Sequence, residues 1–313
     1  MKNISSLQDF KSVCLIGLLI FVAVSCSTDV YKDINSSNKH LTLFAFLTTD
    51  SLFSVHLSKS VDYYSFDDFE RVYDGIIMIE KNDERVDSFA FPFRNLWATR
   101  NSISINQNDK FKITASDQKG NSVSASTIIP QKVQIERVDT SRVIMLGKRY
   151  IESRIVFQDP PDENNYYQLI VTLEEWRSEG DLTVYSTQQL DFHKTDSVFF
   201  IKDQSGSVLS GIDFRGTFSD YRIDGKVYPL RIRFPAYYID NVSNIKKRRV
   251  NFILLSLSYD YFNYFRSRVI ADYNYDLPII DPVKIHGNVE GGLGLVGGIA
   301  VSSKSLEFTI SDF

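Results

Sequence analysis

Carboxylate and amide side chains crowd residues 159–165, which read DPPDENN. Their oxygen atoms are hard ligands of the kind that calcium prefers. The side chains that offer such oxygens here are Asp159, Asp162, Glu163, Asn164 and Asn165. Their spacing does not follow the EF-hand loop, so a calcium site and a solvated turn bent by the two prolines both stay open. A second group, Asp67, Asp68 and Glu70, offers fewer oxygens.

The four histidines are His40, His56, His193 and His286. They lie far apart and none belongs to an H-E-x-x-H pair, so a zinc site would have to be assembled from distant segments. His286 alternates with Asn288 and Glu290, which places the three side chains on one face of an extended strand. That face either lines a pocket or lies on plain surface.

Other catalytic motifs are absent or incomplete. No G-x-S-x-G nucleophile elbow occurs. Gly292, Gly294 and Gly297 match G-x-G-x-x-G, but a dinucleotide site also needs a following helix and an acidic residue about 20 positions further on. Sixteen residues follow Gly297, so we predict that these glycines let the backbone turn or pack closely. We predict that the chain is not an enzyme, and we assign no catalytic, cofactor-binding or metal-binding residue.

Four cations in a row precede an apolar segment at residues 250–257. They are Lys246, Lys247, Arg248 and Arg249. Such a run either contacts anionic headgroups or keeps an aggregation-prone strand soluble. The net charge of −4 excludes an overall basic chain that binds nucleic acid.

The two cysteines are Cys14 and Cys26. Cys26 follows Ala23, Val24 and Ser25, and this segment resembles the lipobox of bacterial lipoproteins, in which a signal peptidase cuts before the cysteine and acyl chains such as palmitate are attached. Val24 and Ser25 depart from the commonest Leu-Ala-Gly form. The alternative is an ordinary secretory signal in which the cysteine has no role.

The segment before Cys26 has the pattern of an export signal. Lys2 and Lys11 precede an uncharged apolar run at residues 13–24, which is shorter than the roughly 20 residues that cross a membrane. We therefore predict a lipoprotein signal peptide at residues 1–25 and a lipidated flexible tether at residues 26–40. Cys26 would be the one cysteine of the mature chain, so no internal disulfide is expected.

Residues 41–130 alternate apolar and polar side chains in short runs, which is typical of half-buried strands. The expected strands are residues 41–47, 52–58, 75–80, 102–105, 110–115 and 122–128, with turns at residues 82–84 and 117–121. Strands at this spacing predict an immunoglobulin-like or transthyretin-like β-sandwich.

Residues 131–313 are predicted to form a second β-rich domain with one helix. The expected strands are residues 133–138, 150–157, 166–175, 184–190, 197–201, 227–234, 250–257 and 306–310. Tyr261, Phe262, Phe265 and Val269 recur at helical spacing, so a helix over residues 259–271 is expected, with Ser258 as N-cap and the aromatic stripe in the core. The predicted fold class is mainly β, with two sandwich-like domains in tandem.

Several segments together resemble the domain of unknown function 4249 family of Bacteroidota outer-membrane lipoproteins. They are the lipobox at Cys26 and residues 41–64, 159–171, 218–226, 250–267 and 281–303, in the family's order. The resemblance implies a mostly β lipoprotein of the cell outer membrane, often encoded beside a TonB-dependent receptor. It implies no catalytic residues, because the family has none agreed.

Three functions follow as hypotheses. The first is a non-enzymatic accessory or ligand-binding partner of a TonB-dependent receptor in nutrient uptake, anchored by Cys26 to either leaflet of the outer membrane. The second is a structural or adhesive envelope protein. The third is a hydrolase whose site is dispersed over several loops. No cofactor is expected beyond the lipid and a calcium ion at Asp159 to Asn165, and nucleic acid is not an expected partner.

Overall fold

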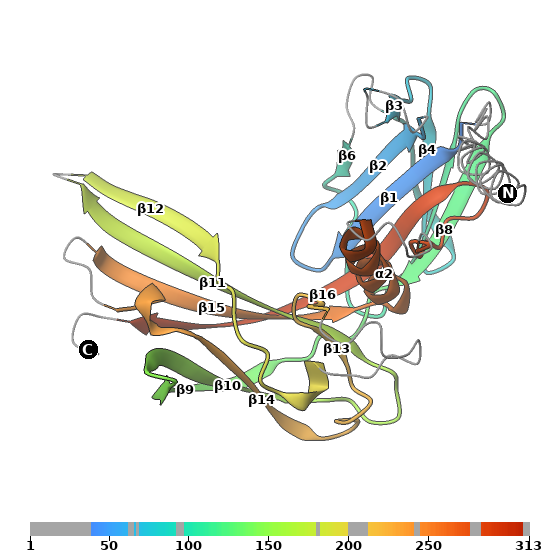
Figure 1. Cartoon of the computed structure of the whole chain (residues 1–313). Helices are drawn as coiled ribbons and strands as arrows, with labels where there is room; N and C mark the ends of the chain where they lie inside the picture. The colour runs from blue at the N-terminus through green and yellow to red at the C-terminus, as the bar shows by residue number, and fades with distance from the viewer. Residues whose placement is uncertain are drawn as a thin grey trace, which may run out of the picture. The chain divides into compact units, whose positions relative to one another are not determined.

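The structure is a computed structural model that describes residues 39–61, 66, 69–91, 97–179, 182–199, 212–240, 245–275 and 283–308. Residues from Lys39 onward form one compact unit. Within the described residues this unit consists mainly of strands in three sheets, with one long helix (Figure 1). The predicted fold class, mainly β with sandwich-like layers, is confirmed.

The largest sheet contains most of the strands. Its strands in spatial order are β12 (Leu182–Gln189), β11 (Tyr166–Glu179), β15 (Ile245–Leu257), β16 (Leu293–Phe308), β1 (Leu41–Thr48), β2 (Phe53–Lys59) and β3 (Glu70–Arg71). Two short strands pair with it at the side, β13 (Thr217–Ser219) with β11 and β6 (Trp97–Arg100) with β2. The remaining strands form two smaller sheets.

One small sheet has the order β5 (Glu84–Ala90), β4 (Ile76–Lys81), β7 (Lys110–Ser116) and β8 (Ser122–Ile128). The other has the order β14 (Val227–Pro235), β10 (Lys148–Gln158) and β9 (Ile135–Met145). Side chains buried between the first of these and strands β1 and β2 form one core, which includes Phe53, Ile77 and Phe111. A second core, which includes Tyr167 and Phe252, lies between the other small sheet and strands β11 and β15.

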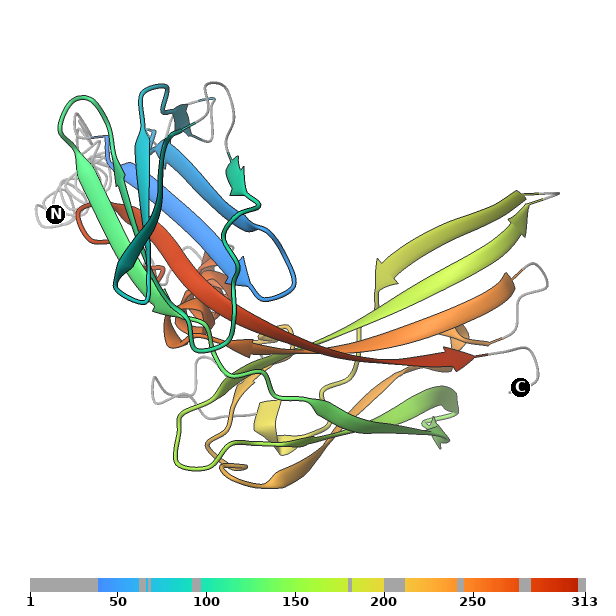
Figure 2. The same ribbon diagram turned by 180° about the vertical axis from the view of Figure 1, so that it is seen from behind.

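Strand β16 belongs to both sandwiches. Its first half pairs in parallel with β1, from Thr42↔Leu293 to Thr48↔Ile299. Its second half pairs antiparallel with β15, from Leu257↔Ile299 to Arg248↔Phe308. Figure 2 shows this red strand passing from blue β1 to orange β15. The domain boundary near residue 130 stays a prediction. The pairing of β16 with β1 crosses this boundary, because β16 follows residue 130 in the chain and yet completes the N-terminal sandwich.

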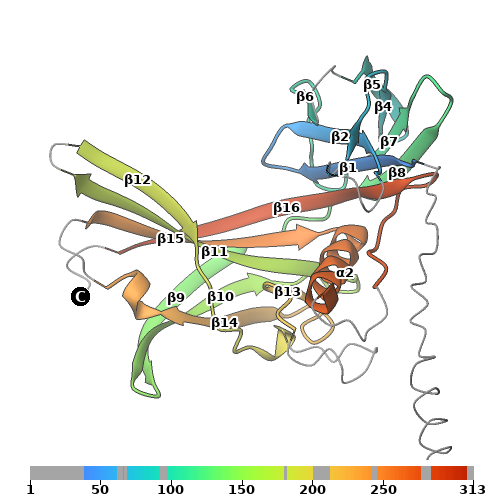
Figure 3. The ribbon, with the colours of Figure 1, turned by 45° about the horizontal axis from the view of Figure 1, so that its top comes forward.

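The helix α2 (Tyr259–Tyr275) confirms the predicted helix and extends it by one turn. The Ser258 hydroxyl accepts a hydrogen bond from the Tyr261 N–H at 3.5 Å, as expected of an N-cap. The ring of Phe262 lies 4.7 Å from that of Tyr166 on β11, and Tyr261 meets Phe46 on β1 at 5.5 Å. The aromatic stripe therefore packs against the large sheet, beside β16 (Figure 3).

The glycine-rich segment differs most from the prediction. It was expected to precede a short final strand at residues 306–310, but it forms the first half of the long strand β16. A Cβ at Gly297 would lie 2.9 Å from the Cβ of Tyr261, and one at Gly298 would lie 2.6 Å from the carbonyl oxygen of Ile128. Helix α2 and strand β8 can approach this strand so closely only because the glycines have no side chain. This confirms close packing as the role of these glycines.

Two shorter segments also differ from the prediction. Residues 102–105 are not a strand, and the strand next to β2 is β6, five residues earlier. Residues 197–199, expected to begin a strand, form the 3₁₀ turn η1 (Ser197–Phe199), whose Val198 is buried in the second core. A second such turn, η3 (Ala236–Tyr238), follows β14. In the part of the chain that the structure describes, no helix is long and apolar enough to span a membrane.

Candidate functional site

A hollow of about 570 Å³ lies over the solvent-facing side of strands β4, β7 and β8. Its lining is mostly charged or polar and consists of Glu80, Asp83, Lys110, Lys112, Ser124, Ala125, Ser126, Asn288 and Glu290. Two of these, Asn288 and Glu290, come from the alternating trio singled out in the sequence. The third, His286, does not line it. Two of the three expected side chains therefore face a pocket.

The β4–β5 turn positions the rim of the hollow. Asn82 and Asp83 have φ angles of 54° and 67°, the left-handed conformation that asparagine and aspartate tolerate in tight hairpin turns. This confirms the turn predicted at residues 82–84. The side-chain oxygen of Asn82 accepts a hydrogen bond from the Lys110 N–H at 2.9 Å, which fixes the turn against β7.

The opposite wall of the hollow is a short extended segment that adds to the edge of β8. Ser124 and Glu290 exchange backbone hydrogen bonds of 3.1 Å and 2.8 Å. The side-chain nitrogen of Asn288 donates to the carbonyl oxygen of Ser126 at 3.0 Å. The Glu290 side chain is left exposed at the wall.

The charges around the hollow are of both signs. The Lys110 ammonium lies 2.9 Å from the Asp83 carboxylate, and the Lys112 ammonium lies 3.7 Å from that of Glu80. The lysine side chains are about half exposed, 50% and 51%. Ion pairs this exposed are weak, so their charges can rearrange to meet a ligand. The arrangement suits a polar ligand that carries a carboxylate and an ammonium group.

His286 takes part in a contact with the helix instead. Its Nε2 lies 2.8 Å from Oδ1 of Asp260 in the first turn of α2, and its backbone N–H donates to the Ser267 hydroxyl at 2.8 Å. That hydroxyl in turn donates to the carbonyl oxygen of Tyr264. Since the serine oxygen is bonded to backbone groups rather than to the imidazole, the three residues do not form a hydrolytic triad.

The other histidines lie in separate places. His56 Nε2 is 2.9 Å from the Ser58 hydroxyl, and its ring meets Trp97 at 5.3 Å. His193 exchanges backbone hydrogen bonds with Arg233, and His40 is exposed. In the described ranges no histidine belongs to a group of three possible metal ligands.

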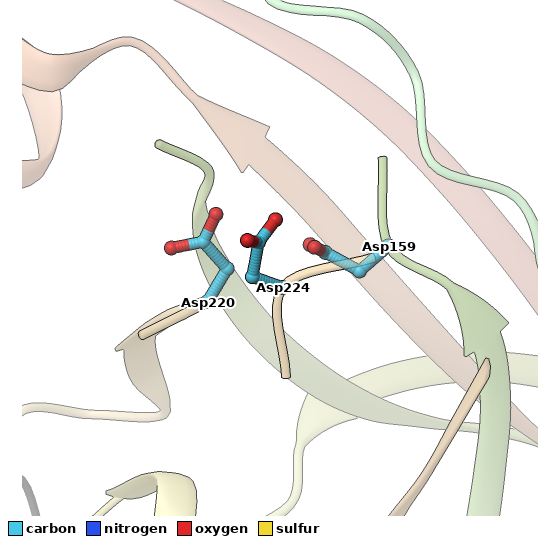
Figure 4. A group of neighbouring side chains, drawn as sticks. All are labelled: Asp159, Asp220 and Asp224. Carbon is cyan, nitrogen blue, oxygen red and sulfur yellow. The ribbon is translucent and has the colours of Figure 1, made fainter. Parts of the chain in front are cut away.

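Three carboxylates do come together elsewhere. The ligand atoms of Asp159, Asp220 and Asp224 lie within 4.8 Å of one another, and Figure 4 shows the three groups side by side. Asp159 follows β10, whereas the other two belong to the turn after β13. The remaining acids of the expected calcium loop, Asp162 and Glu163, do not belong to this group.

The two buried carboxylates, Asp159 and Asp220, already accept hydrogen bonds from donors of the protein. Asp159 accepts hydrogen bonds from the Tyr167 hydroxyl at 2.5 Å and the Gly225 N–H at 3.0 Å. Asp220 accepts one from the Asn165 N–H at 2.6 Å. Asp224 is exposed and accepts one from the Asp162 N–H at 3.1 Å. These bonds connect the DPPDENN turn to the turn at residues 220–225.

Burial raises the pKa of Asp159 and of Asp220, and the neighbouring negative charges add to the effect. The hydrogen bonds from Tyr167, Gly225 and Asn165 oppose the rise without cancelling it. If the cluster holds a cation, these three carboxylates would be the ligands, and the cation would remove the repulsion between them.

The basic run is paired within the protein. Arg248 is buried, its Nε lies 2.8 Å from Oε1 of Glu175, and it also donates to the carbonyl oxygen of Asp240. Arg249 and Lys247 both pair with Glu307, at 3.0 Å and 2.6 Å. Neither sequence interpretation anticipated a buried arginine in this run. Side chains alternate between the two faces of a strand, so the position of Arg248 on the inward face of β15 is the pattern from which its burial could have been predicted.

Some sequence predictions lie outside the described residues. They are the signal peptide, the lipidation site Cys26, the tether up to residue 38, and Asp67 and Asp68 of the second acidic group. Their status as predictions is unchanged.

These features define a class: a β-sandwich protein whose two sandwiches share one strand and whose surface carries an ionic hollow. The chain belongs to the family described as Domain of unknown function (DUF4249), whose model matches residues 27–305. No curated protein matches the chain. Among solved structures it is similar to a segment of two fibronectin type-III domains from chicken tenascin, at 8% identity and a TM-score of 0.21, over 70% of this chain and 91% of that one.

Proposed function

We propose that this protein is a lipid-anchored, non-enzymatic protein of the bacterial outer membrane, of the kind found in Bacteroidota. It acts as an accessory or ligand-binding partner of a TonB-dependent receptor in nutrient uptake. The observation that carries the proposal is Cys26, which follows an export signal and is the one cysteine left after residues 1–25 are removed.

The position of the compact unit supports the anchor. The unit begins at Lys39, so residues 27–38 separate the acylated cysteine from the compact unit. Each buried CH₂ of a lipid chain contributes about 0.8 kcal/mol, so two or three acyl chains hold the protein on a membrane without a spanning helix.

The ionic hollow supports ligand capture. Lys110 and Lys112 can receive a carboxylate, and Glu290 on the opposite wall can receive an ammonium group. Because binding sites are concave and offer a few convergent polar groups, the ligand class that fits is an amino acid or short peptide. The membrane protein partner would then carry out transport.

The decisive experiment is affinity purification of a C-terminally tagged full chain from gently solubilised outer membrane, followed by mass spectrometry. Recovery of a TonB-dependent receptor in near-equal amount supports the proposal. Recovery of the lipoprotein alone contradicts it and favours the structural or adhesive role.

A matched variant tests the anchor separately. Cys26→Ala should move the protein from the membrane fraction to the soluble fraction, whereas Ser27→Ala should leave it in the membrane. Membrane retention of the Cys26→Ala variant would remove the lipid anchor from the proposal.

A further inference from the structure

The outermost strand of the large sheet, β12, has an unusual composition. Its eight residues read LTVYSTQQ and include no charge, no proline and no glycine. All eight are exposed, with Leu182 at 70% and Tyr185 at 53%. One side of the strand pairs with β11 from Thr172↔Gln189 to Glu179↔Leu182. Among the described residues no strand pairs with the other side, which presents a row of backbone N–H and C=O groups.

Such an edge is a template for another strand, and proteins normally protect it with charges, prolines, short length or a covering segment. The other edge strands of this chain have these protections. Strand β5 carries Glu84, Arg85 and Asp87, β9 carries Glu136, Arg137, Asp139 and Arg142, and β14 carries Pro229, Arg231 and Arg233. Strand β3 has two residues, both charged.

Among the described residues two further edge strands lack charges: β13, which has three residues, and β8, which the chain covers. Strand β8 reads SVSASTI, and its free side pairs with the segment around Glu290 through the two backbone hydrogen bonds with Ser124. Asn288 caps the carbonyl of Ser126 in the same row. The chain therefore leaves an edge uncharged where a strand covers it, which points to a covering strand for β12 as well.

We propose that β12 pairs with β12 of a second copy of this chain, antiparallel and about a two-fold axis perpendicular to the sheet. The large sheet of one subunit then continues into that of its partner. This interface is separate from the ionic hollow, which lies on the solvent-facing side of β4, β7 and β8.

The lack of charge in β12 selects a second copy rather than a charged partner strand. At such a two-fold axis the central residue meets its own copy and the residues beside it meet one another, so a charge near the axis would lie close to its own copy. The Lys246 ammonium lies 2.9 Å from the Thr183 hydroxyl, near the end of the strand. When the axis passes through the middle of β12, Lys246 does not face Lys246 of the partner subunit.

The registers that pair the most residues place the two-fold axis at one of the two central residues of β12, Tyr185 or Ser186. In one, Ser186 lies opposite Ser186 of the partner subunit. In the other, Tyr185 lies opposite Tyr185 of the partner subunit. Directly opposed Cα atoms in an antiparallel pair are about 4.5 or 5.5 Å apart, and both distances permit a disulfide.

The test is disulfide cross-linking of the full chain in outer-membrane preparations with a mild oxidant. The variants are Ser186→Cys and Tyr185→Cys, one for each register. The matched control is Ser141→Cys, which is also exposed on an edge strand, β9, next to the charged Arg142. The unsubstituted chain measures any cross-linking through Cys26.

One of the two β12 variants should give about tenfold more disulfide-linked homodimer than the control, because pairing raises the effective thiol concentration to the millimolar range. Equal amounts in all variants would overturn the proposal. Cross-linking of the β12 cysteine to a different protein would also overturn it, and would assign this edge to that protein.

A charge variant supplies an independent readout. Ser186→Lys should convert the detergent-solubilised protein from the mass of two chains to that of one, with an unchanged circular dichroism spectrum. Ser141→Lys should leave the mass unchanged. A wild-type protein with the mass of one chain, or a Ser186→Lys protein that keeps the mass of two, contradicts the pairing.

Discussion

The side-chain amide of Asn288 exchanges two hydrogen bonds with the backbone of Val296, as a neighbouring strand would. The Val296 N–H donates to Oδ1 at 2.9 Å, and Nδ2 donates to the Val296 carbonyl oxygen at 2.9 Å. The same nitrogen lies 3.0 Å from the carbonyl oxygen of Ser126 on β8 and 3.2 Å from Asp260 on α2. One side chain therefore joins β16, β8 and the helix.

Replacing Asn288 with alanine should destabilise the protein by about 1–3 kcal/mol, because the backbone groups of Val296 lose their partners where water has little access. Thermal unfolding followed by circular dichroism measures the effect. Glu290→Ala is the matched control, since its exposed side chain changes while its backbone bonds to Ser124 remain. Equal melting temperatures for the two variants would contradict the structural role of Asn288.

The buried ion pair of Glu175 and Arg248 gives a second prediction. Both residues are nearly inaccessible, at 4% and 5% exposure. Burial acts to raise the pKa of Glu175, but the hydrogen bonds from Arg248 and Arg177 outweigh it and lower the pKa. Glu175→Gln should therefore cost about 3–5 kcal/mol, because it leaves a buried guanidinium without its counter-charge.

A double-variant cycle separates this pair from a general loss of packing. Glu175→Leu combined with Arg248→Met should cost less than either single change, since no buried charge remains. Glu174→Gln, on the outer face of the same strand, should change stability by less than about 1 kcal/mol. Additive single costs would show that the two buried side chains do not depend on each other.

The sequence predicted the strands that obey a simple period and missed those that do not. Leu41, Leu43, Ala45 and Leu47 alternate, and β1 buries every one of them. Three of the seven residues at 293–299 are glycines, and they interrupt any periodic pattern of side chains there. Their strand conformation follows from the parallel pairing with β1, which is distant in sequence and therefore cannot be found in a local pattern.

Close packing at these glycines is testable. Gly297→Ala should destabilise the protein by about 1–3 kcal/mol, as overpacking does, because its Cβ would lie 2.9 Å from Tyr261. Gly147→Ala is the comparison: its φ is +74° and no atom lies within 4 Å of the added Cβ. Its cost of about 1 kcal/mol comes from the backbone alone. A Gly297→Ala protein as stable as the wild type would contradict the close contact.

The acidic cluster shows how far site prediction reached. Of the DPPDENN side chains considered as ligands, Asp159 alone belongs to the cluster among the described residues, and the other two members, Asp220 and Asp224, lie about 60 residues further along the chain. They join it because the turn after β13 packs on the DPPDENN turn, with Asn165 and Asp220 exchanging backbone and side-chain hydrogen bonds. The spacing of residues within either turn does not indicate that the two turns pack together.

Asp224→Asn should stabilise the protein in calcium-free buffer at pH 7, by about 2 °C in melting temperature. The substitution removes a negative charge next to Asp159 and Asp220, whose pKa values burial and this charge raise. A raised carboxyl pKa contributes stability at low pH that is lost as the pH rises through it, so the gain should shrink toward pH 4. A lower melting temperature for Asp224→Asn at pH 7 would contradict this prediction.

The same melting-temperature measurement, repeated with added calcium, tests whether the cluster binds this ion. A cation bound by the three carboxylates would raise the melting temperature of the wild type and would do so less in Asp224→Asn, which lacks one anionic ligand. A calcium site at these three carboxylates predicts a difference between the two proteins that depends on the calcium concentration. An equal response of the two proteins to calcium would exclude the cluster as the binding site.

Asp117 should make the protein sensitive to acid. Burial acts to raise its pKa, but hydrogen bonds from Asn121 and the Lys59 ammonium, 2.9 Å away, outweigh it and lower the pKa to about 2. The folded state therefore binds this proton more weakly than the unfolded state does. Its stabilisation is complete above about pH 4, the ordinary range of an aspartate, and is lost as the pH falls toward 2.

Asp117→Asn should accordingly destabilise the protein at pH 7, and the difference from the wild type should shrink between pH 4 and pH 2. Urea unfolding at a series of pH values measures it. Asp50→Asn, an exposed turn residue, is the control and should follow the wild-type curve throughout. Because Lys59 lies on β2 and Asp117 in the β7–β8 turn, a difference that is independent of pH would mean that this ion pair between the two sheets does not contribute to folding.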